Sequence, residues 1–202
     1  MVNQWTANPW LTTWTEATSQ MIEHAVATNA ATLSAFGVDP DSETTESNAD
    51  EVVKPAADLP GWETERTATT REALAVGDRF SFTKTITDDD VRSFAAASGD
   101  TNPLHLDNEF AEDTRFGERI AHGTLVGGLI SAALARMPGL VVYLSQDLEF
   151  KAPVSVGERL TADCEIIEAL GNNQYRLETR VHRDGETIID GEAVVLVDEL
   201  PE

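Results

Sequence analysis

The sequence predicts an α+β domain in which an antiparallel sheet wraps around one long buried helix. Residues 121–137 form a helical run that is apolar almost all round, several strand-like runs follow it, and turn sequences separate those runs. A helix that is apolar on every side has to be buried, and this one is shorter than the roughly 20 residues needed to cross a bilayer. We therefore expect the strands to cover it.

A strand, two helical segments and a loop are expected before this helix. Alternating residues at 79–87 predict a strand. A helix at 88–99 begins with three aspartates and ends at Gly99. A loop follows over 100–107, and a short helical piece is expected at 108–114. The later strands are expected at 140–150, 158–170, 174–184 and 186–197.

About five strands can shield one side of a single helix, and this leaves an edge of the sheet exposed. We therefore expect two copies of the chain to pair as a homodimer.

The chain before residue 61 differs from the rest in composition and in hydrophobic pattern. Residues 8–37 carry apolar side chains at roughly helical spacing, so they predict one amphipathic helix that ends at Gly37. Residues 38–60 are acidic, polar and proline-bearing, which predicts a flexible linker. The expected organisation is an N-terminal amphipathic helix (1–37), an acidic linker (38–60) and one folded domain (61–202).

The charge balance is strongly acidic. The chain has 36 acidic and 14 basic residues, a net charge of −22, and only three of the basic residues are lysines. Such a surface repels nucleic acid and anionic membrane, so we expect neither as a partner. Self-repulsion is screened by salt, because the Debye length falls to about 3 Å near 1 M. We expect a salt-accumulating halophile as the source, the alternative being an acidic mesophile protein with a charged tail.

Several classes of protein are disfavoured by what the sequence lacks. A single cysteine, Cys164, excludes an internal disulfide and cysteine-based zinc sites, and it is expected to be a core residue. The four histidines show no metal-binding spacing, so no metal is expected. No G-x-S-x-G elbow occurs, which argues against a serine hydrolase. The sequence has no apolar run long enough to span a membrane, and its N-terminus does not resemble a signal peptide. We therefore expect a cytoplasmic protein.

The candidate chemistry lies between residues 100 and 131. Asp100 and His105 are five apart in one loop, where a carboxylate and an imidazole can act together as general acid and base. The alternative is that Asp100 caps the loop and His105 is a half-buried structural residue. His122 and Gly123 open the buried helix, where free backbone N–H groups bind developing negative charge. Ser131 offers a hydroxyl two turns further along.

These residues stand in a longer pattern. The stretches ASGDTNPLHLDNEFA, RIAHGTLVGGLIS and LVVYLSQDLEFKAPVSVGERLTADCEI together resemble the R-specific enoyl-CoA hydratases, the MaoC-like dehydratases of hydratase-2 type. The resemblance covers about residues 74–197, and the order and spacing of the three stretches make it specific. It implies a hot-dog fold, in which a sheet wraps a central helix, and an assembly of two such units.

The resemblance also implies roles for single residues. By position, Asp100 and His105 match the catalytic pair of the family. The backbone N–H of Gly123 falls where the thioester carbonyl is received, and substrate binding is assigned to Asn102, His122, Gly123 and Ser131. Many relatives have a bulkier residue where this chain has Thr124, and this difference bears on the acyl pocket.

The implied reaction is the reversible hydration of a trans-2-enoyl-CoA to an R-3-hydroxyacyl-CoA. Coenzyme A is then part of the substrate, and no further cofactor is needed. Its phosphates require a local basic patch, for which Lys151, Arg115 and Arg119 are candidates. Three alternatives stay open: another hot-dog dehydratase acting on a dicarboxylic acyl-CoA or on an acyl chain bound to a carrier protein, a hot-dog thioesterase, and a non-catalytic acyl-CoA-binding module.

The helix expected at residues 8–37 lies outside the resemblance. Enzymes of the implied type commonly supply polyhydroxyalkanoate synthesis, so this arm is a candidate for docking on a polymer granule or on a partner protein. The alternative is that it packs on its own dimer.

Deletion of residues 1–60 tests the docking hypothesis. If the arm docks the enzyme, the truncated protein no longer sediments with polymer granules, whereas the full chain does. The measurement is the fraction of protein recovered with isolated granules in high salt. Unchanged partition would exclude docking by this arm.

Overall fold

The computed structural model describes residues 54 and 56–201, and one sheet organises this part of the chain. The helix predicted at 8–37 and the linker up to residue 53 lie outside the described residues, so both stay predictions. The described elements, in chain order, are β1 (Glu63–Arg66), the 3-10 turn η1 (Arg71–Ala73), β2 (Arg79–Thr85), α2 (Asp88–Ser98), α3 (Pro103–Leu106), α4 (Asn108–Glu112), α5 (Gly123–Leu134), β3 (Leu140–Phe150), β4 (Arg159–Gly171), β5 (Gln174–Arg183) and β6 (Glu186–Asp198).

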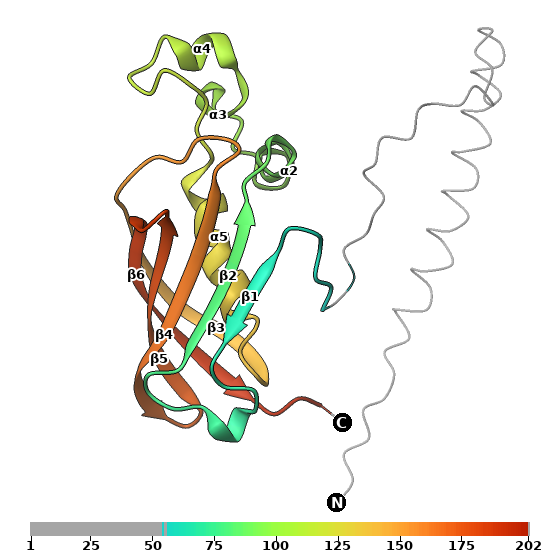
Figure 1. Cartoon of the computed structure of the whole chain (residues 1–202), viewed down its shortest axis with the longest axis vertical. Coiled ribbons are helices and arrows are strands. Elements are labelled where there is room, and N and C mark those ends of the chain that lie inside the picture. Colours follow the sequence, from blue (N-terminus) through green and yellow to red (C-terminus); the bar gives the residue numbers. More distant parts are fainter. Residues whose placement is uncertain (1–53, 55, 202) are drawn as a thin grey trace, which may run out of the picture. The chain divides into compact units, whose positions relative to one another are not determined.

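The sheet has six strands in the order β1-β2-β4-β5-β6-β3, and every neighbouring pair is antiparallel. Helix α5 lies against one face of this sheet, and α2, α3 and α4 gather toward one end of it (Figure 1). The predicted hot-dog fold is thus confirmed, and the five predicted strands are found close to their expected bounds. Strand β1 was not predicted, because its four residues are all exposed and show no alternation.

Register places the buried side chains of neighbouring strands in rows across the sheet. Phe82 of β2 pairs with Ala162 of β4, and Ala162 pairs with Val181 of β5. In a second row of the same kind, Phe80 of β2 pairs with Cys164 of β4. All of these side chains are buried, and together with the apolar residues of α5 they form one continuous core. Alternation along each strand therefore decides which face of the sheet receives the helix.

Helix α5 is more one-sided than its composition predicts. Its buried residues are Val126, Leu129, Ile130, Ala133 and Leu134. The opposite side carries Thr124, Gly128 and Ser131, which are exposed within this single chain. The sheet covers one side of the helix, as expected for about five strands, and the other side is open within this single chain. The helix also ends at Leu134, earlier than the expected residue 137.

Helix α2 begins with a capping box. The Asp90 N–H donates to Thr87 Oγ1 (3.2 Å), and the Thr87 N–H donates back to Asp90 Oδ2 (2.8 Å). Burial raises the pKa of Asp90, but the hydrogen bonds from Lys84 and Thr87 outweigh it and leave the pKa below its usual value. This start fixes α2 firmly on the chain that leaves β2.

The segment expected as a loop over 100–107 contains a one-turn helix, α3. Asn102 caps it, since its Oδ1 accepts from the Leu104 N–H (3.1 Å), and Pro103 occupies the first turn. The prediction of a loop was therefore wrong over residues 103–106. Asparagine at the N-cap and proline in the first turn both favour the start of a helix.

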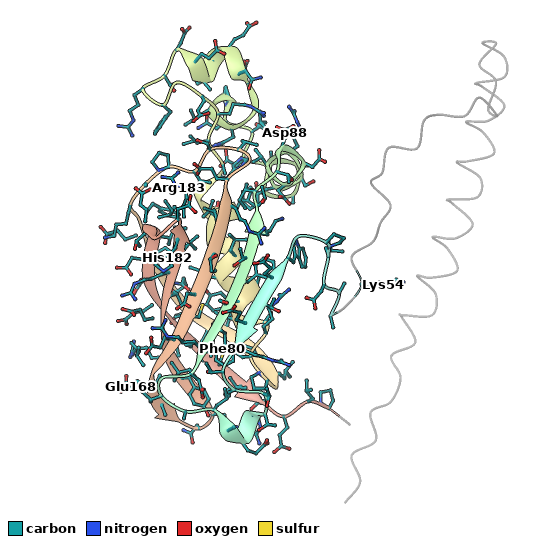
Figure 2. All side chains as sticks on the ribbon, in the orientation of Figure 1. Lys54, Phe80, Asp88, Glu168, His182 and Arg183 are labelled. Atoms are coloured by element: carbon teal, nitrogen blue, oxygen red, sulfur yellow. The ribbon has the colours of Figure 1, made fainter. Side chains whose placement is uncertain are left out.

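Ion pairs on the sheet use several of the few basic residues. Arg183 contacts both Glu158 and Glu186 at 2.6 Å, and these partners raise the pKa of its guanidinium. Arg176 pairs with Glu168 at 3.1 Å. Arg183 and Glu168 are labelled in Figure 2. None of the helices in the described part of the chain is long and apolar enough to cross a membrane.

The substitution Gly191→Ala tests how closely the backbones of β3 and β6 approach each other. A Cβ at this position would lie 1.9 Å from the Asp147 carbonyl oxygen, so Gly191→Ala forces the two backbones apart and is expected to cost about 3 kcal/mol. Gly128→Ala is the matched control, because a Cβ there meets nothing within 4 Å and alanine favours the helix by about 1 kcal/mol. Denaturant unfolding in high salt measures both variants, and equal stability would contradict the close approach.

Candidate active site

Asp100 is positioned by the end of α2. Gly99 adopts a left-handed conformation (φ 78°), which turns the chain out of the helix. The Asp100 N–H then donates to Ser98 Oγ (3.2 Å), and its Oδ1 accepts from the Asn102 N–H (3.3 Å). The side chain is exposed. The carboxylate is thus held by the backbone of its own loop while still open to a ligand.

His105 projects from α3 and is buried, with 9% of its surface exposed. Its Nδ1 lies 2.7 Å from the carbonyl oxygen of Ile120. A carbonyl oxygen can only accept, so Nδ1 carries the hydrogen and Nε2 of the neutral ring keeps its lone pair. The backbone of a distant segment therefore sets His105 in the tautomer of a base.

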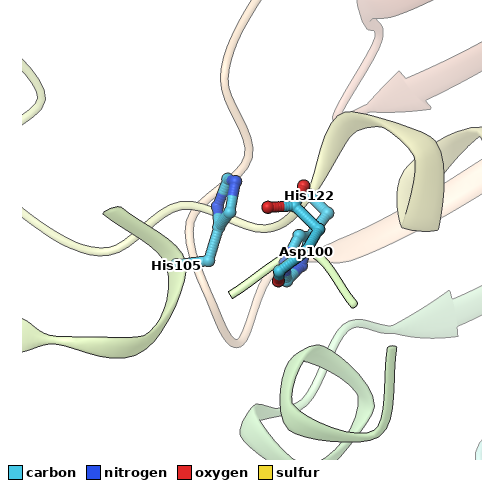
Figure 3. Close-up of side chains that lie close together, drawn as sticks. All are labelled: Asp100, His105 and His122. Carbon is cyan, nitrogen blue, oxygen red and sulfur yellow. The ribbon is translucent and has the colours of Figure 1, made fainter. Parts of the chain in front are cut away.

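His122 directly precedes α5 and is almost fully buried, with 1% exposed. Its Nε2 lies 3.0 Å from the carbonyl oxygen of Asp100, and its ring faces that of His105 with 3.9 Å between centroids. Asp100, His105 and His122 each offer one side-chain atom within 4.8 Å of the other two. Figure 3 shows these three side chains together. The structure thus brings the side chains of Asp100 and His105 near each other, without a direct hydrogen bond between them among the described contacts.

A cavity of about 320 Å³ adjoins this group. His105 and Gly123 belong to its wall, and most of the other lining side chains are apolar: Phe116, Ile120, Ala121, Val126, Phe150, Ala152, Pro153, Val154, Ile188 and Ile189. The lining does not include Asp100, Asn102, His122 or Ser131, so of the predicted catalytic pair only His105 belongs to the wall. Ser131 lies eight residues beyond Gly123, which is about 12 Å along a helix. Of the residues assigned to substrate binding, only Gly123 therefore lines the cavity.

Gly123 is the first residue of α5, where backbone N–H groups lack partners within the helix. A Cβ at this position would lie 2.8 Å from Cε1 of Phe150. Glycine therefore lets the Phe150 ring lie directly against the start of the helix.

The three candidate basic residues occupy different settings. Arg115 and Lys151 line the cavity, and Lys151 also pairs with Glu149 at 2.5 Å. Arg119 instead binds Asp88 and the Asn108 side chain, each at 2.7 Å. Side-chain hydrogen bonds from Arg92 and from Arg119 lower the pKa of the Asp88 carboxyl group. Arg119 thus braces α2 against the segment after α3, and it is withdrawn as a phosphate-binding candidate.

The same group bears on the expectation that no metal is bound. Two histidines and a carboxylate are suitable ligand types. One nitrogen of each ring is already engaged, since His105 Nδ1 binds the Ile120 carbonyl and His122 Nε2 binds the Asp100 carbonyl. The absence of a metal cofactor stays a prediction.

Cys164 lies in the core. It is fully buried on β4, and burial raises the pKa of its thiol. A protonated thiol inside the sheet is no nucleophile.

Three contributors to the site had no signal in the sequence. Ile120 acts through its carbonyl oxygen, which any residue carries. Phe94 packs against the His122 ring at 4.9 Å between centroids, and Phe150 covers Gly123. Each is an ordinary apolar residue in sequence, and only the fold brings it to the site.

A hot-dog fold that places a carboxylate and an imidazole near an apolar cavity is suited to acid–base chemistry. The family profile described as "MaoC like domain" matches residues 72–189. The chain therefore belongs to the family of MaoC-like domains, and it is an enzyme of the hydratase type.

Relatives and solved structures agree with this membership. The chain is 40% identical over 129 residues to an (R)-specific enoyl-CoA hydratase from Rhodospirillum rubrum, covering 62% of this chain and 90% of the relative. It is 35% identical to a mitochondrial 3-hydroxyacyl-[acyl-carrier-protein] dehydratase from Solanum lycopersicum, covering 63% and 79%. The structure of R-hydratase PhaJ1 from Pseudomonas aeruginosa is similar, with a TM-score of 0.62 and 40% identity, covering 68% of this chain and 90% of that one.

Proposed function

We propose that this protein is an R-specific enoyl-CoA hydratase, which adds water reversibly to a trans-2-enoyl-CoA and forms an R-3-hydroxyacyl-CoA. The observation that carries the proposal is the pairing of Asp100 with His105 beside an apolar cavity whose wall includes the start of α5. The Rhodospirillum rubrum relative carries the name of the same activity.

The Asp100–His105 pair is spaced to hold one water molecule. Two atoms that each bind the same water at hydrogen-bond distance lie about 4.6 Å apart, and one ring nitrogen of His105 lies within 4.8 Å of an Asp100 carboxylate oxygen, which leaves room for a bridging water. The Nε2 lone pair of His105 takes one water proton, while the Asp100 carboxylate accepts a hydrogen bond from the other hydrogen. The hydroxyl group adds to C3, and the proton on Nε2 passes to C2, so the elements of one water are added.

The start of α5 receives the charge that this addition creates. When hydroxide adds to C3, electrons move onto the thioester oxygen. The Gly123 N–H stands at the positive end of a 12-residue helix and lines the same cavity as His105. Such a donor is typically worth about 3–4 kcal/mol in the transition state.

The cavity wall has apolar side chains for an acyl chain and basic side chains for the phosphates of coenzyme A. Val126, Ile188 and Ile189 supply an apolar wall for an acyl chain. Arg115 and Lys151 supply positive charge in a protein of net charge −22, and they are the candidates for the phosphates of coenzyme A. Coenzyme A enters as part of the substrate in this proposal, without a further cofactor.

The working form is proposed to be a homodimer. Strand β3 is an edge of the sheet and exposes Leu140, Val142, Tyr143 and Leu144. An apolar edge strand of eleven residues is a template for pairing with another chain. A second copy that adds its own β3 covers this edge with an identical partner.

The setting of the enzyme in the cell is part of the same proposal. An R-3-hydroxyacyl-CoA is the thioester from which polyhydroxyalkanoate is made, so we place the enzyme in the supply of that polymer. It would work in the cytoplasm, with residues 8–37 docking it on the granule. The net charge of −22 supports a halophilic source.

A second candidate is a dehydratase acting on an acyl chain bound to a carrier protein. The relative from Solanum lycopersicum favours it, because its name gives such a thioester as the substrate. The two candidates share Asp100 and His105 and differ in what carries the acyl chain. Kinetics with crotonyl-CoA and with crotonyl-carrier protein separate them.

Asp100→Asn and His105→Gln test the catalytic pair. Loss of either acid–base group is expected to lower kcat/KM for hydration of crotonyl-CoA in high salt by about 10²–10⁴-fold, with unfolding unchanged. Asp113→Asn is the matched control, because this residue at the end of α4 lies outside the site, and it is expected to retain full activity.

The outcomes separate the remaining alternatives. Activity within twofold of the wild type in both variants would overturn the assignment. Release of free coenzyme A by the wild type, with the double bond intact, would indicate a thioesterase. Binding of crotonyl-CoA without any turnover would indicate a binding module.

A further inference from the structure

The buried ring of His122 is joined to the catalytic loop by one hydrogen bond. Its Nε2 lies 3.0 Å from the carbonyl oxygen of Asp100, across 22 residues of sequence. Because a carbonyl oxygen only accepts, Nε2 must carry the ring hydrogen. The start of α5 therefore holds the backbone of the residue that bears the catalytic carboxylate.

The other ring nitrogen supports this tautomer. Nδ1 of His122 is buried and has no hydrogen-bond partner among the described residues. A hydrogen on Nδ1 would leave a buried donor without an acceptor. Burying an unpaired ring lone pair there costs less free energy, which favours the tautomer with the hydrogen on Nε2. His105 has the opposite tautomer, because its Nδ1 donates to Ile120. Two backbone carbonyls thus fix two facing imidazoles in complementary forms.

The position of His122 separates it from the substrate. Its side chain is 1% exposed, whereas the Asp100 side chain is exposed and the neighbouring Gly123 lines the cavity. Its ring is packed between Phe94, at 4.9 Å, and His105, at 3.9 Å. A group placed in this way acts on the reaction through its neighbours.

We propose that His122 is a positioning residue of the hydratase: its Nε2–H holds the Asp100 backbone, and its ring face sets the distance from the Asp100 carboxylate to the His105 imidazole. The inference rests on the proposed function, since it concerns the same pair. It replaces a direct role of His122 in substrate binding. A displacement of about 1 Å between catalytic groups is enough to cost about 10²-fold in rate.

Two substitutions separate the hydrogen bond from the volume of the ring. His122→Gln keeps an N–H near the position of Nε2, whereas His122→Leu fills the space without a donor. We expect His122→Leu to lower kcat for crotonyl-CoA about 100-fold with KM within about threefold, and His122→Gln to stay within about tenfold of wild-type kcat. His182→Leu, on β5 and labelled in Figure 2, is the matched control and is expected to leave both constants unchanged.

Equal losses of kcat in the Gln and Leu variants would overturn the role of the hydrogen bond. A raised KM with unchanged kcat would instead restore direct substrate binding. Thermal unfolding of each variant shows whether the fold is kept, and if His122→Leu unfolds, the kcat and KM of His122→Gln still decide between positioning and binding.

A measurement without substrate keeps this inference distinguishable from the proposed function. In the full-length wild type labelled with ¹⁵N-histidine, NMR should show the His122 ring, assigned by its loss in His122→Gln, protonated at Nε2 and bare at Nδ1. A ring protonated at Nδ1 would contradict the inference even if hydration occurs. If crotonyl-CoA is not hydrated at all, the proposed function fails, while the ring measurement still reports on the contact with Asp100.

Discussion

The packing of α5 against the concave face of the sheet is the constraint on which the rest of the site depends. Val126, Ile130 and Leu134 lie in the same core as the buried side chains of β2, β4 and β5. This packing fixes where the helix begins, and the first residue, Gly123, is part of the cavity wall. The free N–H groups at that point are therefore placed by burial of apolar surface, since no charged residue anchors this end of the helix.

The proposed catalytic pair, Asp100 and His105, is positioned in turn through backbone carbonyl groups. The Ile120 carbonyl fixes His105, and the Asp100 carbonyl is bound by His122, so each imidazole is anchored on a group that cannot change its charge. This arrangement differs from the outer surface, where arginines such as Arg183 pair with several carboxylates. High salt screens exposed ion pairs strongly and buried hydrogen bonds weakly. Salt therefore affects the hydrogen bonds of the site less than it affects the ion pairs on this strongly acidic surface.

The sequence predicted the fold well where one local pattern decides the structure. Alternation located β2 and β3 to β6, and the apolar run located α5, but the exposed stripe around Ser131 depends on how far the sheet wraps. The spacing of Asp100 and His105 indicated that their side chains could lie near each other, because five residues and a proline leave the loop little freedom, and the structure places them within 4.8 Å; their joint role stays a proposal. Contacts between distant segments had no local signal. Arg119 looks like any surface arginine until α2 places Asp88 beside it.

The configuration at C3 of the product reports on how water and substrate are held in the site. If Asp100 and His105 present water to one face of an enoyl thioester whose carbonyl oxygen is bound by the Gly123 N–H, only that face is attacked. Wild-type protein incubated with crotonyl-CoA in high salt should form 3-hydroxybutyryl-CoA that is R at C3 by chiral chromatography after hydrolysis. An S or racemic product, or no uptake of water, would contradict the account.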